Sequence, residues 1–164
     1  MIQDNYIKVG MADLNVTHLT GVLKTTGLGS CVGLTLYDAK AKVAGMAHVM
    51  LPTSEIAREG KLNIAKYADT AVPEMIQRME GLGASIKRME AKMAGGSQMF
   101  AFGGNSDTMR IGPRNVESCK EMLKRYLIPL KAEDTGGNYG RTIEFDCETG
   151  TLFIRSVQQG VKEL

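Results

Sequence analysis

The 164-residue chain has three cysteines and two histidines, the residues from which a thiol–imidazole site would be built. Cys31 follows the turn Thr-Gly-Leu-Gly-Ser and begins a run of apolar residues. A free thiol with a pKa near 8.5 is only about 3% ionised at pH 7, so a nucleophilic cysteine needs a nearby base. Backbone N–H groups of a glycine-rich turn can bind an anion or stabilise a tetrahedral oxyanion. Cys31 is therefore a candidate nucleophile for acyl transfer, with Gly29 and Ser30 as candidate backbone donors, although many turns of this composition are only turns.

His48 is the candidate base, because the expected register places it opposite Cys31. We expect strands at 31–37 and 42–51 to form a hairpin through a four-residue loop. On that register Cys31 faces His48, with Cβ atoms about 4.5–5.5 Å apart. A slip of one residue would put the two side chains on opposite faces of the sheet. The alternative is that His48, in an apolar run, is a buried structural histidine.

A third group should orient the imidazole by accepting a hydrogen bond from its second ring nitrogen. Thr25 and Thr26 are near Cys31 in sequence, and a threonine hydroxyl or a backbone carbonyl could do this. His18 lies in a polar-flanked segment, and we interpret it as structural or solvated.

The other two cysteines fit the core. Cys119 lies on the apolar side of a helical pattern and Cys147 on the apolar side of an alternating strand, and free cysteine is among the most buried residue types. An odd, widely spaced set argues against a disulfide framework and for a reducing compartment. The cysteines and histidines show no metal-ligand spacing. We expect neither a metal nor an organic cofactor.

The elements that must position these residues are mostly strands. Alternating and apolar runs predict an α/β or α+β class with layered antiparallel or mixed sheets and helices packed outside. We expect a single domain over residues 1–164. Asn115 resembles a helix N-cap, although Arg114 and Asn115 could instead line the site, and Pro129 closes that helix. Strands are expected at 6–9, 15–23, 31–37, 43–51, 85–93, 143–147 and 151–157, and helices at 69–81 and between Asn115 and Pro129.

Composition excludes several classes of protein. A net charge of +2, with no basic block, gives no support for nucleic-acid binding. The longest apolar runs fall far short of the ~20 residues needed to span a bilayer, so no membrane insertion is expected. The first residues lack a basic segment followed by an apolar one, so no signal peptide is expected. These features favour a cytoplasmic protein.

Six segments of the chain together carry a family resemblance. They are Thr25-Thr-Gly-Leu-Gly-Ser-Cys-Val32, Gly45-Met-Ala-His-Val-Met-Leu-Pro52, Lys66-Tyr-Ala-Asp-Thr-Ala71, Gly95-Gly-Ser-Gln-Met-Phe100, Ile111-Gly-Pro-Arg-Asn115 and Ala132-Glu-Asp-Thr-Gly-Gly-Asn138. In this order they closely resemble the CheD family of bacterial chemoreceptor glutamine deamidases. On the resemblance, the nucleophile of the family falls on Cys31, its base on His48, and its orienting threonine on Thr25, six residues before the cysteine. Thr26 stands where the family usually has an aliphatic residue.

The resemblance implies hydrolysis of particular glutamine side chains to glutamate in methyl-accepting chemotaxis receptors. It also implies a fold similar to the catalytic domain of the necrotizing-factor toxins, and binding to CheC, a phosphatase of CheY-phosphate. The residue chemistry suits this reaction: an imidazolium–thiolate pair of His48 and Cys31 would attack the carboxamide and form a thioester.

Three alternatives stay open at this point. The chain could be a non-catalytic adaptor whose main output is CheC activation, with Phe100 and Phe102 as a contact surface or as ordinary core residues. The same thioester could also support transglutamination, or the enzyme could hydrolyse glutamyl methyl esters.

Overall fold

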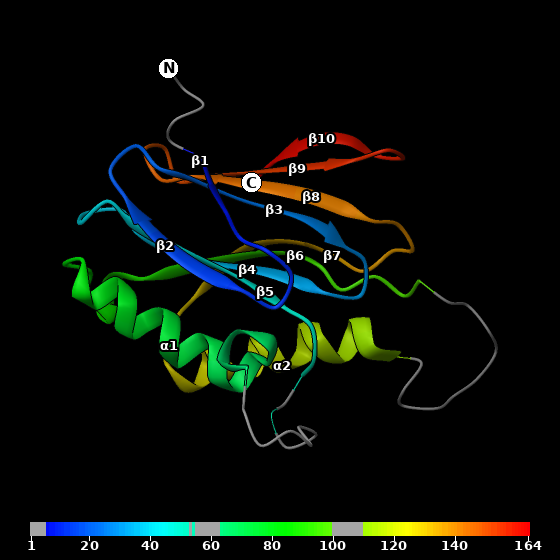
Figure 1. The fold of residues 1–164 in the computed structure, drawn as a ribbon, viewed down its shortest axis with the longest axis horizontal. Coiled ribbons are helices and arrows are strands. Elements are labelled where there is room, and N and C mark those ends of the chain that lie inside the picture. Colours follow the sequence, from blue (N-terminus) through cyan, green and yellow to red (C-terminus); the bar gives the residue numbers. More distant parts are fainter. Residues whose placement is uncertain (1–5, 53, 55–62, 100–109) are drawn as a thin grey trace.

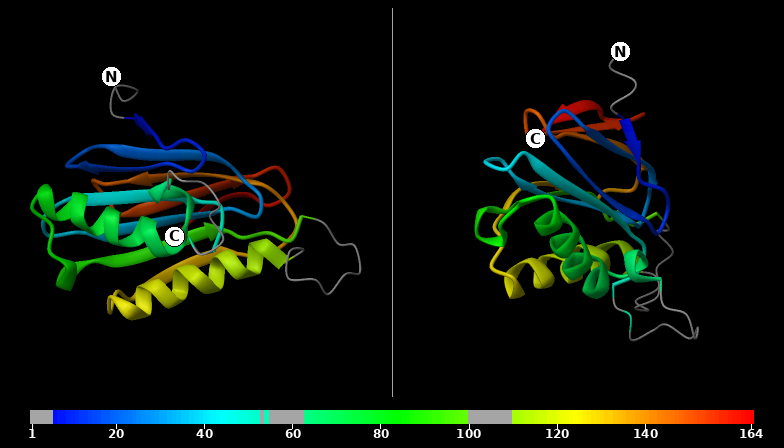
Figure 2. Two further views of the ribbon diagram at one scale, coloured as in Figure 1. Left: turned by 60° about the horizontal axis from the view of Figure 1, so that its bottom comes forward. Right: turned by 60° about the vertical axis from the view of Figure 1, so that its left-hand side comes forward.

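Two five-stranded sheets lie face to face, and two helices cover the outer face of one of them (Figures 1 and 2). The computed structural model describes residues 6–52, 54, 63–99 and 110–164. This layered, mixed arrangement confirms the predicted class, with both described helices on the same sheet. The first sheet has the order β1 (Tyr6–Lys8), β3 (Val22–Leu28), β8 (Arg141–Asp146), β9 (Thr151–Ser156) and β10 (Gly160–Glu163). The second has the order β2 (Leu14–His18), β5 (Val43–Val49), β4 (Val32–Asp38), β6 (Glu90–Gly95) and β7 (Leu130–Thr135).

The single strand predicted at 15–23 is wrong, because the chain turns there from one sheet to the other. Strand β2 ends at His18 in the second sheet, and β3 begins at Val22 in the first. Leu19 has a positive φ of 61°. Gly21 packs so closely on Thr17 that an added Cβ would lie 1.9 Å from the threonine hydroxyl oxygen. The turn brings β3, which carries Thr25, over the second sheet.

The hairpin of β4 and β5 forms as predicted, but its loop lies one residue later. Asp38 stays in the ladder opposite Val43, and its buried carboxylate accepts the N–H groups of Lys40 and Ala41 at 3.1 Å each. The same carboxylate pairs with Arg88 at 2.9 Å. Because the aspartate caps the turn from inside the strand, the register shifts by two residues from the predicted one.

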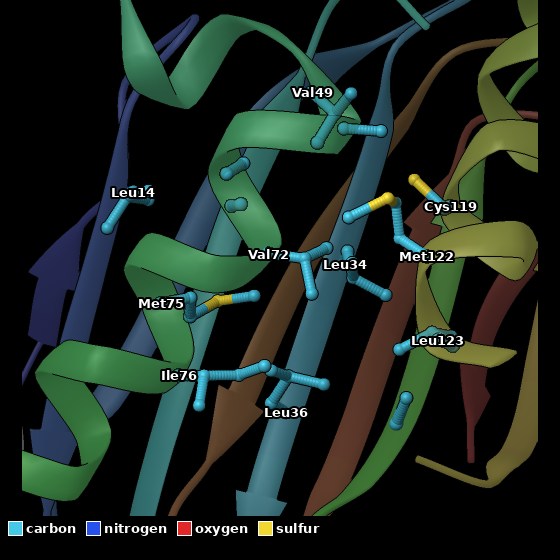
Figure 3. Packing of buried hydrophobic residues seen from close by; sticks show 14 of the residues in the cluster. Leu14, Leu34, Leu36, Val49, Val72, Met75, Ile76, Cys119, Met122 and Leu123 are labelled. Carbon is cyan, nitrogen blue, oxygen red and sulfur yellow. The ribbon is translucent and has the colours of Figure 1, made fainter. Parts of the chain in front are cut away.

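The helices α1 (Ala68–Gly81) and α2 (Ile111–Arg125) form one hydrophobic core with the outer face of the second sheet. Apolar residues of β4 alternate, so Val32, Leu34 and Leu36 face this core. Figure 3 shows the side chains of both helices meeting there. The labelled residues are Leu14, Leu34, Leu36, Val49, Val72, Met75, Ile76, Cys119, Met122 and Leu123.

Asn115 is not a helix cap. Helix α2 begins four residues earlier, at Ile111, so Asn115 lies inside the helix, where its side chain is fully buried. The strand predicted at 85–93 is wrong in its first half, because a short 3-10 helix, η4 (Ile86–Arg88), precedes β6. Strands β7 and β10 were not predicted from the sequence. A second 3-10 helix, η3 (Ile64–Lys66), precedes α1.

Candidate active site

Thr25 and His48 form a hydrogen bond between the two sheets. His48 of β5 is fully buried, and Thr25 of β3 is 1% exposed. The Thr25 Oγ1 atom lies 2.7 Å from His48 Nδ1. Thr26 is exposed on the opposite side of its strand. Of the two threonines, Thr25 is therefore the one that holds the imidazole.

Cys31 lies directly before β4, on the same face of the sheet as His48. The residue directly opposite His48 is Gly33, so the expected direct pairing of Cys31 with His48 is wrong. Since the register differs by two residues and side chains alternate with a period of two, the shift leaves both side chains on the face between the sheets. Cys31 packs in the core between the sheets and is 8% exposed. Diagonal neighbours across a strand pair are about 7–8 Å apart.

The thiol and the imidazole are not hydrogen-bonded to each other in the described structure. His48 Nε2 is buried and has no hydrogen-bond partner among the described residues. Because Nδ1 is engaged by Thr25, Nε2 is the ring nitrogen left for a reacting group. Hydrogen bonds of unliganded active sites are often long and tighten when substrate binds.

Gly33 gives the two sheets the room to meet at this point. A Cβ on Gly33 would lie 2.4 Å from Cδ1 of Ile143 and 3.1 Å from Cδ1 of Leu28. Ile143 is the cross-strand partner of Thr25 in the first sheet. The missing side chain at Gly33 thus allows the strand pair that carries Thr25 to pack against β4 and β5, within reach of His48.

The turn before Cys31 is held by its carbonyl groups. The carbonyl oxygen of Gly29 accepts from Ser97 N at 2.9 Å, that of Ser30 from Asn115 Nδ2 at 3.0 Å, and that of Cys31 from Gly96 N at 2.8 Å. Within the described residues, the N–H groups of Ser30 and Cys31 have no acceptor in another residue, and the Cys31 N–H interacts with its own thiol, which partly opposes the effect of burial on the thiol pKa. The Gly29 N–H donates to Gly27 O at 3.1 Å, so it is already engaged.

Burial sets the charge state of the resting site. It raises the pKa of the Cys31 thiol and lowers the pKa of the His48 imidazole. Each shift favours the neutral form. Burial therefore disfavours the expected imidazolium–thiolate pair in the unliganded protein. Burial also raises the pKa of Cys119 to about 12 and that of Cys147 to about 11, as expected for cysteines of the core.

Ser97 is a residue near the site that the sequence analysis does not identify, although it lies in a segment that carries the family resemblance. Of the two interpretations of Asn115, the helix cap is wrong, and its bond to Ser30 O places it beside the turn before Cys31. His18 ends β2 with an exposed side chain. Phe100 and Phe102, the expected partner-binding residues, lie outside the described residues. Among the residues that the structure describes, no group of three or more His, Cys, Asp or Glu side chains could hold a metal ion. No described helix is long and apolar enough to cross a membrane.

A groove of about 800 Å³ lies next to the turn. Gly27 and Met99 belong to its wall, and Met99 Cγ lies 3.3 Å from the position of a Cβ on Gly29. The other side is formed by the ends of β8, β9 and β10, including Arg155 and Val161. Its volume is within the range of about 300–1,000 Å³ that is typical of ligand sites.

A cysteine on the same face as a buried histidine that bonds to a threonine is an arrangement that can support cysteine-dependent acyl transfer. Comparison with known proteins shows the family of the chain. Residues 50–156 match the family described as CheD chemotactic sensory transduction, and the chain belongs to the CheD family.

Three relatives show the extent of the similarity. The chemoreceptor glutamine deamidase CheD of Halalkalibacterium halodurans is 54% identical over 161 residues, which cover 98% of this chain and 99% of that protein. The proteins of the same name from Bacillus subtilis and Bacillus licheniformis are 49% and 48% identical, over 96% and 97% of this chain and 95% of each of those proteins. These alignments run nearly the full length of the chain and so include Thr25, Cys31 and His48.

Proposed function

We propose that this CheD-family protein is a chemoreceptor glutamine deamidase that hydrolyses glutamine side chains of chemotaxis receptors to glutamate. The observation that carries the proposal is the 2.7 Å contact between Thr25 and His48 on the face that also carries Cys31. The N–H groups of Ser30 and Cys31 support it, because they have no acceptor in another described residue and can stabilise an oxyanion. The names of the full-length relatives give the substrate class.

The proposed reaction has two halves. The sulfur of Cys31 attacks the carboxamide carbon while its proton passes to His48 Nε2, and the N–H groups of Ser30 and Cys31 bind the oxyanion. The C–N bond then breaks, ammonia leaves with the proton from His48, and a thioester remains. A water molecule gives a proton to His48 and attacks the thioester carbon. The C–S bond breaks, glutamate leaves, and the thiol regains its proton. No metal or cofactor takes part in this scheme.

The tautomer of His48 decides whether it can accept the proton. Nε2 has a free lone pair only if the neutral ring carries its proton on Nδ1. In that tautomer His48 Nδ1–H donates a hydrogen bond to Thr25 Oγ1, which lies 2.7 Å from Nδ1. We therefore assign Thr25 the role of holding the reactive tautomer. Burial favours the neutral thiol and the neutral imidazole, so the proposed scheme has the thiol proton pass to His48 during attack.

Gly29 has a different role from the one expected. Its N–H is engaged with Gly27 O, so Ser30 and Cys31 are the proposed oxyanion donors. Gly29 serves instead through its carbonyl, which Ser97 holds. A receptor segment that carries the target glutamine could occupy the groove beside Met99 and Gly27.

Replacement of the nucleophile tests the proposal. Cys31→Ala should abolish ammonia release from a receptor cytoplasmic fragment and the accompanying mass change of its glutamine peptides. Cys119→Ala is the matched control, because Cys119 is fully buried in the helical core and lies outside the core between the sheets that holds Cys31. The control should stay active while it remains folded. Undiminished deamidation by Cys31→Ala would overturn the assignment.

The finer parts of the proposal come from the family resemblance. They are binding to CheC, with Phe100 and Phe102 as candidate contacts, a fold similar to the necrotizing-factor toxin domain, and a cytoplasmic location, which a reactive thiol requires. The same receptor assay separates the alternatives. An adaptor would release no ammonia with or without CheC, a transglutaminase would incorporate an added primary amine, and an esterase would release methanol from methylated receptors.

A further inference from the structure

One side chain of α2 reaches both halves of the site. The Asn115 amide nitrogen donates to Ser30 O at 3.0 Å and to Met50 O at 2.9 Å. Both partners are carbonyl oxygens, which can only accept, so the amide nitrogen must face them. Ser30 precedes the nucleophile, and Met50 follows His48 by two residues. Asn115 thus ties the cysteine turn to the end of the strand that carries the base.

The bond to Ser30 also orients an oxyanion donor. The peptide group between Ser30 and Cys31 is planar and trans, so the Ser30 carbonyl and the Cys31 N–H point in opposite directions. When Asn115 holds the carbonyl on the side of α2, the Cys31 N–H is turned away from the helix. Among the described residues that N–H has no acceptor outside its own residue, where it interacts with the Cys31 thiol.

The chain makes an unusually close approach so that Asn115 can reach this turn. A Cβ on Gly112 would lie 2.1 Å from Ser97 O, and one on Gly96 would lie 2.3 Å from Cγ2 of Val116. Two glycines therefore let the first turns of α2 lie directly on the backbone that follows β6. Gly96 and Ser97 themselves hold the carbonyls of Cys31 and Gly29, but only through backbone N–H groups. Of the three residues that hold the carbonyl groups of the turn, Asn115 is the one that does so through its side chain.

We propose that Asn115 is a positioning residue for the deamidation: its amide aims the Cys31 N–H at the developing oxyanion and keeps the turn in register with the His48 strand. The inference rests on the proposed function. It assigns Asn115 no contact with the substrate, so its loss should lower kcat and leave KM nearly unchanged.

Asn115→Asp is the sharpest variant, because an ionised aspartate has the same shape but no hydrogen to donate, and an aspartic acid kept neutral by burial has only one hydrogen for the two carbonyl oxygens. Asn63→Asp is its matched control. Asn63 caps η3 through Oδ1, which accepts from Ala65 N at 3.1 Å, and a carboxylate keeps that acceptor. Receptor-fragment deamidation is measured for both variants, together with the rate of Cys31 alkylation by iodoacetamide and the thermal unfolding curve.

We expect Asn115→Asp to lower kcat about 10²-fold, as misplacement of a reacting group by about 1 Å can do. KM should change less than about threefold, and alkylation should stay near the wild-type rate, because alkylation needs no oxyanion site. Asn63→Asp should behave as wild type. An unchanged kcat in folded Asn115→Asp would overturn the inference. A loss of alkylation rate as large as the loss of kcat would also overturn it, because the variant would then have changed the reactivity of the thiol itself.

Asn115→Ser keeps the test decisive if the aspartate variant does not fold. A serine hydroxyl retains one donor, so an intermediate loss of kcat is expected, and full activity would overturn the inference. Failure of the proposed function itself has a different signature: wild type and Cys31→Ala would then convert glutamine equally.

Discussion

The contact between the sheets at Gly33 gives a prediction whose size follows from the structure. In Gly33→Ala, the new Cβ would lie 2.4 Å from Cδ1 of Ile143, a fully buried side chain. Overpacking of this kind costs about 1–3 kcal/mol. Replacing glycine by alanine also lowers the conformational entropy of the unfolded chain, which offsets about 0.4–1 kcal/mol of this loss of stability. We expect a net loss of about 1–2 kcal/mol in the free energy of unfolding.

Ile143→Val is the matched second change, because valine lacks the Cδ1 atom that the new methyl group meets. Alone it should cost about 0.5–1.5 kcal/mol. In that background Gly33→Ala should cost almost nothing, so the double-mutant cycle should show a favourable coupling of about 1–2 kcal/mol. A melting-temperature shift of about 2–4 °C per kcal/mol applies to a chain of this length.

Urea unfolding followed by far-ultraviolet circular dichroism measures the cycle, since the chain has no tryptophan. The same variants test the link to the site, because Ile143 pairs with Thr25. At a temperature where all variants are folded, Gly33→Ala should lower kcat and Ile143→Val should restore part of it. An equal cost of Gly33→Ala in both backgrounds would refute the packing argument.

Two further predictions concern the reacting groups. Thr25→Ser keeps the hydroxyl that bonds to His48 Nδ1 and should retain most of the activity. Thr25→Val removes that hydroxyl and should lower kcat about 10- to 100-fold, which is the equivalent of a lost buried hydrogen bond of about 1–3 kcal/mol. Equal activities of the two variants would contradict the assigned role of Thr25. The rate of Cys31 alkylation should rise with pH through a midpoint above that of free cysteine, because burial raises the pKa of this thiol. Cys119 and Cys147, with pKa values of about 12 and about 11, should not react near neutral pH. A midpoint for Cys31 well below 8.5 would show that its thiolate is already formed and would contradict the prediction.

The sequence predicted the site better than it predicted its geometry. The glycine turn, the alternation and the hairpin were enough to put Cys31 and His48 on one face, since a period of two survives a shift of two residues. They were not enough to fix the register. That depends on Asp38, whose carboxylate is held by Arg88 and by Ser85 N, and both partners are more than 40 residues away in the chain.

The same limit explains the strands that were not predicted. Residues 19–21 carry no proline or asparagine–glycine pair, so periodicity joined β2 and β3, which lie in different sheets. Strand β7 is a half-exposed edge strand with charged residues, and it gives no apolar signal of its own. Local pattern finds buried strands, whereas edge strands depend on tertiary pairing.

Asn115 shows why the sequence alone could not decide the remaining part of the site. A single asparagine before a helical pattern is a good N-cap by local rules. Its observed role needs Ser30 and Met50 to lie side by side, which only the folded sheets bring about.

The candidate site therefore draws groups from all three layers of the fold. Thr25 comes from the first sheet, Cys31 and His48 from the second, and Asn115 from the helices outside it. The bond between Thr25 and His48 is buried and those of Asn115 are partly buried, so breaking one leaves a polar group with little access to water. The geometry needed for attack is thus held by the same contacts that hold the layers together. It follows that changes in sheet packing at Gly33 and in helix packing at Gly112 should affect catalysis before they unfold the protein.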